Sequence, residues 1–344
     1  MKAGFRSLPV LLGACLSVVA TARANITFNL IPDPGTPQSV VDAFGLAADR
    51  WSALIANDVT INVAVGYPTL SPGILGQTIN TSITPDYASV RAALNASATT
   101  AVDASAYAHL QVGPNYTRLV NHTSDNPSGT NSATVYSESL SPVYVTRANA
   151  KALGLLGSST ELDGTIRFSS NIPFDFNPGD GVSGGQYDFV SIASHEMGHL
   201  LGFASTVDQI EQSGGTIPGS QLPSSILDLF RFSASSLAAG PGVIDTAADT
   251  RAKFFSVDGG ATSVAGFATG AIYGSGYQAS HWKEFTFKGL MDPTIFGGRG
   301  PNIGNTDMFA FDALGYRLAP EPGTSVLFAL GAVVLGWALR KRQR

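Results

Sequence analysis

The first part of the chain switches between the apolar spacing of strands and that of helices. Residues 25–30 alternate apolar and polar positions, and residues 59–65 are a second run of strand-forming residues. Between them, residues 40–55 place large apolar side chains at helical spacing, with Ser39 as the expected N-cap. This strand–helix–strand order predicts a mixed sheet with helices packed against it.

The pattern continues with longer helices and shorter strands. Residues 86–111 and 146–155 predict helices, and residues 164–170 alternate as a strand at the edge of a sheet would. Residues 171–187 are rich in Gly and Pro and predict a loop. A last helix is expected over residues 307–314.

Together these elements predict an α+β fold with a twisted mixed sheet and packed helices. No internal repeat is evident, so we expect one domain over residues 25–318. It would have two lobes that divide near Gly202, the upper over about 25–202 and the lower over about 203–318. Short Gly/Ser/Pro-rich pieces after Gly202 predict an irregular lower lobe.

Residues 1–24 have the order of a secretory signal peptide. Lys2 and Arg6 precede an apolar run over residues 8–20, and residues 22–24 read Ala-Arg-Ala, a small-x-small cleavage pattern. A lipid-modified Cys15 after a lipobox-like sequence is the alternative, which the continued apolar run disfavours. We therefore expect export and cleavage by signal peptidase.

The C-terminal residues form a second targeting signal. Residues 320–322 read Pro-Glu-Pro, an apolar run covers 324–339 with marginal length for a bilayer span, and a basic cluster closes the chain. This three-part order resembles the PEP-CTERM sorting tail of Gram-negative bacteria. The resemblance implies that residues 319–344 meet an exosortase-type enzyme, with transient membrane anchoring and a cell-envelope or extracellular destination.

Composition narrows the possible partners. Charged residues make up 13% of the chain and the net charge is −5, so a basic nucleic-acid-binding surface is not expected. Cys15 is the single cysteine, and its removal with the signal peptide leaves no disulfide. Stability must then come from an ordinary hydrophobic core.

The strongest chemical signal lies in one helix. Residues 195–199 read His-Glu-Met-Gly-His and follow Asp188, the expected cap of a helix over 189–201. Residues four apart share a helix face, so both imidazoles can reach one ion. Glu196 lies beside the first ligand and can act as general base toward a metal-activated water. Gly198 is unfavourable inside a helix by about 1 kcal/mol relative to Ala, so helix propensity does not explain this pattern.

His195 and His199 supply two zinc ligands, one short of the usual three. Their motif continues to Gly202, and this HExxHxxG run resembles the metzincin clan of metalloproteases. In the short metzincin pattern the third ligand follows three residues after that glycine. Here the position holds Ser205, a poor zinc ligand, so the third ligand must come from elsewhere.

Two residues can replace it. Asp208 is close in sequence, whereas His281 is distant and is followed by Trp282. The distant arrangement resembles leishmanolysin-type metzincins, in which an insertion separates the helix from a third histidine. Imidazole suits zinc, and the entropic cost of a longer loop grows only logarithmically. We favour His281, with Asp208 as the alternative third ligand.

Residues 290–293 read Leu-Met-Asp-Pro and resemble the metzincin Met-turn. In that resemblance Met291 lies beneath the metal as an apolar floor and is not a ligand. The resemblance covers about residues 26–318 and extends to bacterial PEP-CTERM-tailed metalloproteases. It implies a metzincin-like two-lobed domain, one catalytic zinc ion, and a secreted endopeptidase that acts on proteins or peptides with Glu196 as general base.

A second function class stays open. A non-catalytic surface or matrix protein that keeps zinc for structure would suit the low charge and the sorting tail equally well. Glu196 argues for catalysis, because a structural zinc site needs no base there. In the catalytic hypothesis, the strand at residues 164–170 could pair with an extended peptide substrate.

Other candidate residues carry weaker signals. Residues 175–181 hint at a calcium loop but lack its closing Glu and invariant Gly, so a plain turn is favoured over Ca²⁺. His109 and His122 lack ligand spacing and are expected at the surface. Asp228 and Arg231 are as well suited to a structural ion pair as to any chemistry.

Overall fold

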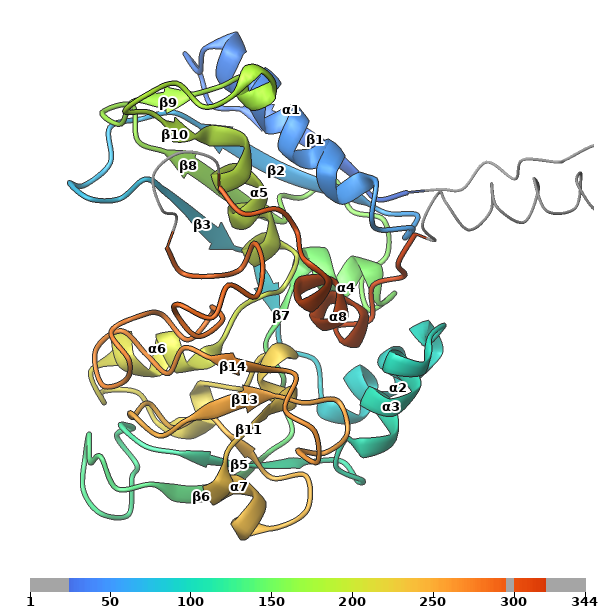
Figure 1. Cartoon of the computed structure of the whole chain (residues 1–344). Helices are drawn as coiled ribbons and strands as arrows, with labels where there is room; N and C mark the ends of the chain where they lie inside the picture. The colour runs from blue at the N-terminus through green and yellow to red at the C-terminus, as the bar shows by residue number, and fades with distance from the viewer. Residues whose placement is uncertain (1–24, 295–299, 320–344) are drawn as a thin grey trace, which may run out of the picture.

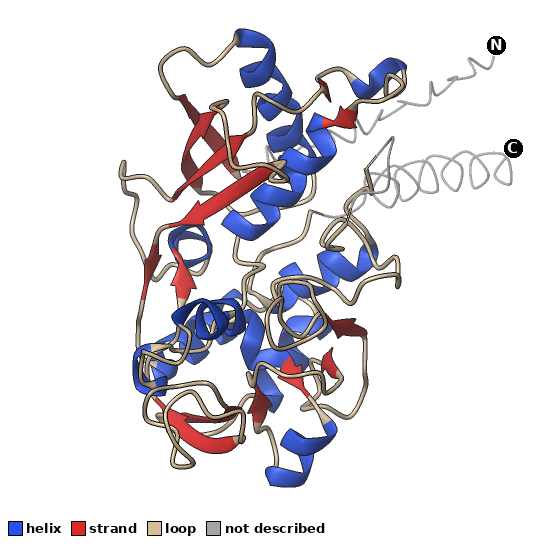
Figure 2. Ribbon diagram, turned by 90° about the vertical axis from the view of Figure 1, so that its left-hand side faces the viewer, coloured by secondary structure: helices blue, strands red, loops and turns tan. Residues whose placement is uncertain are grey.

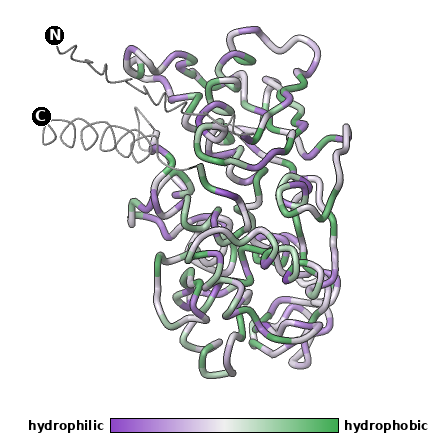
Figure 3. The backbone as a smooth tube through the Cα atoms, turned by 90° about the vertical axis from the view of Figure 1, so that its right-hand side faces the viewer, coloured by the Kyte–Doolittle hydropathy of each residue, from purple (hydrophilic) through white to green (hydrophobic). Residues whose placement is uncertain are grey.

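The computed structural model describes residues 25–294 and 300–319. The polypeptide forms two lobes built from helices and several small sheets, which is the α+β class expected from the sequence (Figure 1). A single large apolar cluster contains side chains from both lobes, from Phe44 in the upper to Phe232 in the lower. Figure 3 shows apolar stretches of the trace throughout both lobes.

A four-stranded sheet frames the upper lobe. Its order is β1 (Thr27–Pro32), β2 (Thr60–Gly66), β8 (Gly164–Phe168) and β3 (Gly76–Asn80). The strands β1, β2 and β8 are parallel, whereas β3 pairs with β8 in the antiparallel direction. Strand β2 is buried along nearly its whole length, as expected of a strand covered on both faces.

Two long helices pack against this sheet and against each other. They are α1 (Gln38–Ser52) and α5 (Phe189–Leu200), which run side by side in the upper lobe (Figure 1). Helix α1 buries Phe44 and Trp51 on its apolar face. The Trp51 indole nitrogen also donates to the carbonyl of Ser194 at 2.8 Å, which fixes α1 on α5.

The expectation that residues 164–170 form a sheet edge is wrong. Strand β8 lies between β2 and β3, so β3 occupies the edge. Gly164 permits this packing, because a Cβ there would lie 2.5 Å from Leu200 Cδ1 and 2.8 Å from the carbonyl oxygen of Ile79. A larger residue would push apart the helix and the two strands.

The lower lobe combines segments that are far apart in sequence. One sheet has the order β12 (Ile244–Asp245), β5 (Tyr116–Val120), β6 (Tyr136–Leu140), and the other has the order β11 (Arg231–Phe232), β13 (Lys253–Phe255), β14 (Ala265–Phe267). Strands β5 and β6 precede Gly202, so the lobes are not divided at that residue as expected. The hydrophobic pattern marks a strand but does not identify a distant partner.

The remaining elements are short. The helices are α2 (Tyr87–Ser97), α3 (Ala101–His109), α4 (Arg147–Ala152), α6 (Thr206–Ser213), α7 (Ala234–Ala239) and α8 (Asn305–Ala313). The strands are β4 (Ser82–Ile83), β7 (Val145–Thr146), β9 (Phe174–Asp175) and β10 (Tyr187–Asp188). Single 3₁₀ turns are η1 (Pro178–Asp180), η2 (Gly219–Gln221) and η3 (Leu227–Phe230). Figure 2 shows how much of the chain is loop.

The helices differ from the expected ones in several respects. The helix expected over residues 86–111 is two helices, because Ala98 is extended and Thr100 begins α3 with a capping box to Asp103. Ser39 lies inside α1, which starts after Pro37 without a side-chain cap. Helices α6 and α7 were missed in a segment expected to be irregular.

Within the described ranges, no helix combines the length and apolar character needed to cross a bilayer. The expected signal peptide at residues 1–24 and the sorting tail from residue 320 onward lie outside these ranges.

Candidate metal centre

Helix α5 is fixed at both ends as the sequence predicts. The Asp188 carboxylate accepts the backbone N–H of Ser191 at 2.9 Å and caps the helix. After Leu201 the chain turns through Gly202, whose φ of 111° lies in the region that favours glycine. Helix α5 thus ends one residue after His199, and the chain turns away at Gly202.

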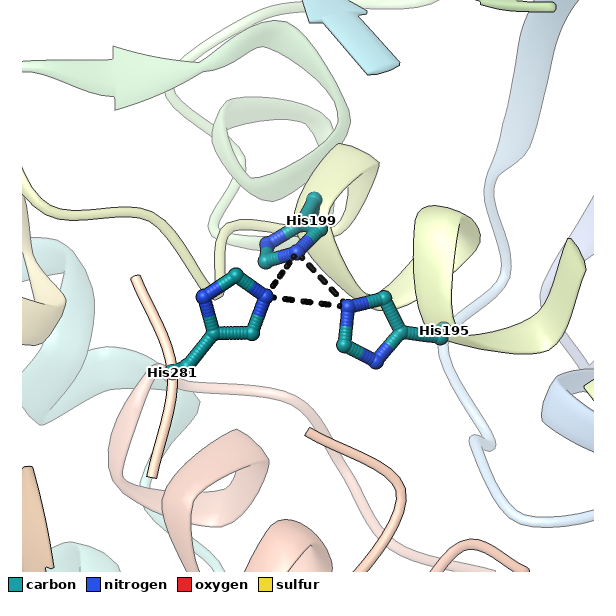
Figure 4. A group of neighbouring side chains, drawn as sticks. All are labelled: His195, His199 and His281. Atoms are coloured by element: carbon teal, nitrogen blue, oxygen red, sulfur yellow. Dashed lines mark hydrogen bonds between the residues drawn. The ribbon is translucent and has the colours of Figure 1, made fainter. Parts of the chain in front are cut away.

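Three histidines converge at this helix. The Nε2 atoms of His195 and His199 are 3.1 Å apart, and those of His281 lie 3.1 Å from His195 and 3.3 Å from His199 (Figure 4). His281 comes from the loop before Trp282, far along the chain. All three lie within one compact group of side chains that could hold a metal ion.

Backbone carbonyls fix the tautomer of each imidazole. The Nδ1 atoms of His195, His199 and His281 lie 2.7, 2.7 and 3.1 Å from the carbonyl oxygens of Leu290, Phe203 and Gln278, respectively. A carbonyl only accepts, so each Nδ1 carries the hydrogen. In a neutral ring the facing Nε2 then has a bare lone pair, the form that binds a metal.

This donor set fits a divalent ion. Three bare lone pairs facing one another repel unless a cation lies between them. Tetrahedral zinc–nitrogen bonds of about 2.0–2.1 Å place ligand nitrogens about 3.3 Å apart, close to the spacing here. Burial, with His195 beside it, lowers the pKa of His199 to about 3. Burial, with His199 and then His195 beside it, lowers the pKa of His281 well below its usual value. These two rings are therefore neutral at pH 7, as zinc requires.

Glu196 lies beside His195 in sequence and lines the same cavity as the three histidines. This cavity has a volume of about 750 Å³ and opens between strand β3, helix α5 and the loop that carries His281. The Thr78 hydroxyl donates to Glu196 Oε2 at 2.7 Å. Burial raises the pKa of Glu196, while His195 and Thr78 lower it.

Met291 packs directly against helix α5, which carries the motif from His195 to His199. A Cβ on Gly198 would lie 2.4 Å from Met291 Sδ, so the glycine makes room for the methionine. Met291 is fully buried. The presence of a glycine at this helix position is thus explained by its packing against Met291, despite its low helix propensity.

The structure does not bring Asp208 into the histidine group. Its carboxylate instead accepts the backbone N–H groups of Ala279 and Ser280 at 2.6 and 3.0 Å, as well as the Ser280 hydroxyl. Asp208 therefore holds the residues immediately before His281. Asp208, the alternative third ligand, thus supports the loop that carries His281, the favoured one.

Comparison with known proteins identifies only the C-terminal segment. Residues 318–343 match the family model of the PEP-CTERM protein-sorting motif. The chain is a bacterial exported protein. Its sorting motif directs it to the cell envelope and implies recognition by an exosortase-type enzyme. No curated protein and no solved structure matches the chain.

Two residues of the centre were missed by sequence reasoning. Thr78 was in a segment without a strand signal, and Asp307 was expected only at the start of the last helix. The Asp307 carboxylate accepts N–H groups from Trp282, Leu290, Met291 and Gly304. Its position at the start of the expected last helix was the only signal available, and that signal does not indicate contacts with Trp282 or Met291.

The weaker candidates have structural explanations. His122 is buried and its ring stacks on Tyr273 at 3.7 Å, so the expectation of a surface residue is wrong. The pair Asp228–Arg231 forms a fully buried ion pair at 3.0 Å. Asp175 accepts backbone N–H groups with both carboxylate oxygens, the arrangement of a turn. His109, expected at the surface, is exposed.

Proposed function

We propose that this chain is an exported zinc-dependent endopeptidase of the metzincin type. His195, His199 and His281 are the metal ligands, and Glu196 is the catalytic base. The observation that carries the proposal is the convergence of three Nε2 lone pairs next to a carboxylate in an open cavity. Three protein ligands leave a coordination position for the reaction, the pattern of catalytic zinc sites.

When bound, zinc supplies a Lewis acid that lowers the pKa of a water molecule toward 7. Glu196 takes the proton from that water as the water oxygen bonds to the peptide carbonyl carbon. The same carboxyl then gives the proton to the amide nitrogen as the carbon–nitrogen bond breaks. Glu196 thus begins and ends the cycle as a carboxylate.

The edge strand β3 supports a peptide as substrate. Residues 73–80 line the cavity, and within the described part of the chain β3 pairs only with β8. Its other edge can pair with an extended peptide. The substrate-pairing strand is thus β3, not the strand at residues 164–168, whose two edges are occupied.

A non-catalytic zinc protein is the competing proposal, and an assay separates the two. The purified protein is incubated with fluorogenic peptides, with a zinc chelator, and after zinc is restored. The endopeptidase proposal predicts cleavage that is lost with chelator and recovered with zinc. A zinc-loaded protein that cleaves no peptide in a broad library would favour the non-catalytic role.

A further inference from the structure

Strand β3 is joined to the motif helix at two points. The Thr78 hydroxyl oxygen lies 2.7 Å from Glu196 Oε2 and 2.9 Å from the Glu196 carbonyl oxygen. Two residues along the same strand, Asn80 Nδ2 donates to the carbonyl of His199 at 3.2 Å. Strand β3 therefore contacts helix α5 at both Glu196 and His199.

Thr78 makes a contact that no other side chain makes. Across residues 25–294 and 300–319, it alone hydrogen-bonds the Glu196 carboxylate. The single hydroxyl hydrogen can be donated to the carboxylate or shared with the carbonyl oxygen of the same residue, and the shorter contact, to Oε2, is the one that holds the carboxylate. A glutamate side chain loses considerable rotamer entropy when it is ordered, and a bond already present before substrate arrives removes that loss from the reaction.

The location of Thr78 adds a second consequence. Thr78 pairs with Ile166 of β8, which fixes the height of the residue along the sheet. A peptide that pairs with the outer edge of β3 is then aligned with the strand that holds Glu196. Strand β3 would therefore set both the register of a bound peptide and the orientation of Glu196.

We propose that Thr78 is a positioning residue that holds Oε2 of Glu196 and leaves Oε1 for the reacting water. This inference rests on the proposed function. It predicts that the hydroxyl contributes to kcat and not to zinc binding or KM, because the group touches neither the metal nor the substrate.

The test compares Thr78→Val, which replaces the hydroxyl with a methyl group, with Thr78→Ser, which keeps a hydroxyl. Thr165→Val is the matched control, since Thr165 lies on the neighbouring strand β8 opposite Ile79. Each zinc-loaded protein is assayed for peptidase kcat, KM and zinc content. We expect Thr78→Val to lose about 10- to 100-fold in kcat, as is typical for an outer-shell partner. We expect KM and zinc content to stay within about twofold of the wild-type values. Thr78→Ser should recover most of the lost kcat, because it keeps the hydroxyl.

Each other outcome overturns the inference. Wild-type kcat in Thr78→Val, together with an inactive Glu196→Gln variant, refutes the role of Thr78 but leaves the endopeptidase proposal intact. A wild-type rate in Glu196→Gln refutes the endopeptidase mechanism itself. A change confined to KM, a parallel loss of zinc, or a Thr78→Ser variant no better than Thr78→Val contradicts positioning by the hydroxyl. If Thr78→Val does not fold, Thr78→Ala provides the same comparison.

Discussion

The carboxylate of Asp307 accepts a hydrogen bond from the indole nitrogen of Trp282 at 2.8 Å. Trp282 is the residue after His281, and the same carboxylate accepts the backbone N–H groups of Leu290 and Met291. Leu290 in turn accepts from His195 Nδ1. One buried acid therefore supports His281 on the loop, His195 on the helix, and the turn that contains Met291.

We predict that Asp307→Asn weakens zinc binding by about 10- to 100-fold, the usual effect of losing a partner that orients the ligands. The Asn side chain has one acceptor oxygen, and its NH2 group would face an N–H donor that the second Asp307 oxygen now accepts. The turn at Leu290 and Met291 and the Trp282 side chain would therefore shift. Zinc affinity is measured by competition with a chromogenic chelator. Asp42→Asn, on an exposed face of α1, is the control. Equal affinities in the two variants would exclude this role.

The identity of the third ligand gives a second prediction. His281→Ala should lower zinc affinity by more than about 100-fold, because a catalytic site needs three protein ligands. Asp208→Ala should retain stoichiometric zinc and lose about tenfold in affinity, since Asp208 only supports the loop. Metal content after dialysis distinguishes them. Loss of zinc in the Asp208 variant with full retention in the His281 variant would reverse the assignment.

Sequence reasoning reached the parts of the site that are local in the chain. Residues 188–202 contain the expected cap, His195, Glu196, His199 and the terminating glycine. The structure confirms the cap, the helix and the glycine turn, and it gathers both histidines with His281 in a group that could hold a metal ion. His281 was favoured because its distance from the helix and the following Trp282 resemble the pattern of leishmanolysin-type metzincins. Asp208 was considered only as an alternative ligand and Asp307 was given no role, because a carboxylate gives no sequence signal of which distant N–H groups it accepts.

The sheets were less predictable for a related reason. Alternation marks residues 164–168 as a strand but cannot distinguish an interior strand from an edge when the neighbour, β3, lacks a clear pattern. The pairing of β5 with β12 joins residues 118 and 244. Such pairings depend on the complete packed arrangement and not on any local window.

A buried acid pair predicts a pH dependence of stability. Burial and the neighbouring Asp103 raise the pKa of Asp312 to about 7, well above the value near 3.9 of an unfolded aspartate. The folded protein thus binds this proton more tightly, so the stabilisation is complete below about pH 4 and is lost as pH rises through about 7.

Asp312→Asn removes this titration and should keep the bond from the Thr100 hydroxyl. At pH 8 the variant should be more stable than the wild type by about 1 kcal/mol, or roughly 2–4 °C in Tm for a domain of this size. At pH 4 the difference should vanish or reverse. Paired thermal unfolding at both pH values, with equal zinc, provides the measurement. A difference that does not vary with pH would contradict the shifted pKa.

The sorting tail should be dispensable for folding. The last described contacts of the C-terminus are the bridge between Ile55 and Leu318 and the hydrogen bond from Ala319 N–H to the carbonyl of Leu54. A chain that ends at Ala319 keeps both. We expect it to match the Tm and zinc content of the full chain, measured in detergent for both. Aggregation or metal loss in the shortened protein would mean that the tail belongs to the folded domain.

The most direct test of the account is the peptidase rate of Glu196→Gln with zinc content measured in the same sample. Glu161→Gln is the control, because Glu161 is exposed and outside the cavity. Loss of a general base typically lowers the rate by about 10²- to 10⁴-fold, so we predict a zinc-loaded, folded and nearly inactive Glu196 variant beside a fully active Glu161 variant. Cleavage by Glu196→Gln at the wild-type rate would contradict the proposed mechanism.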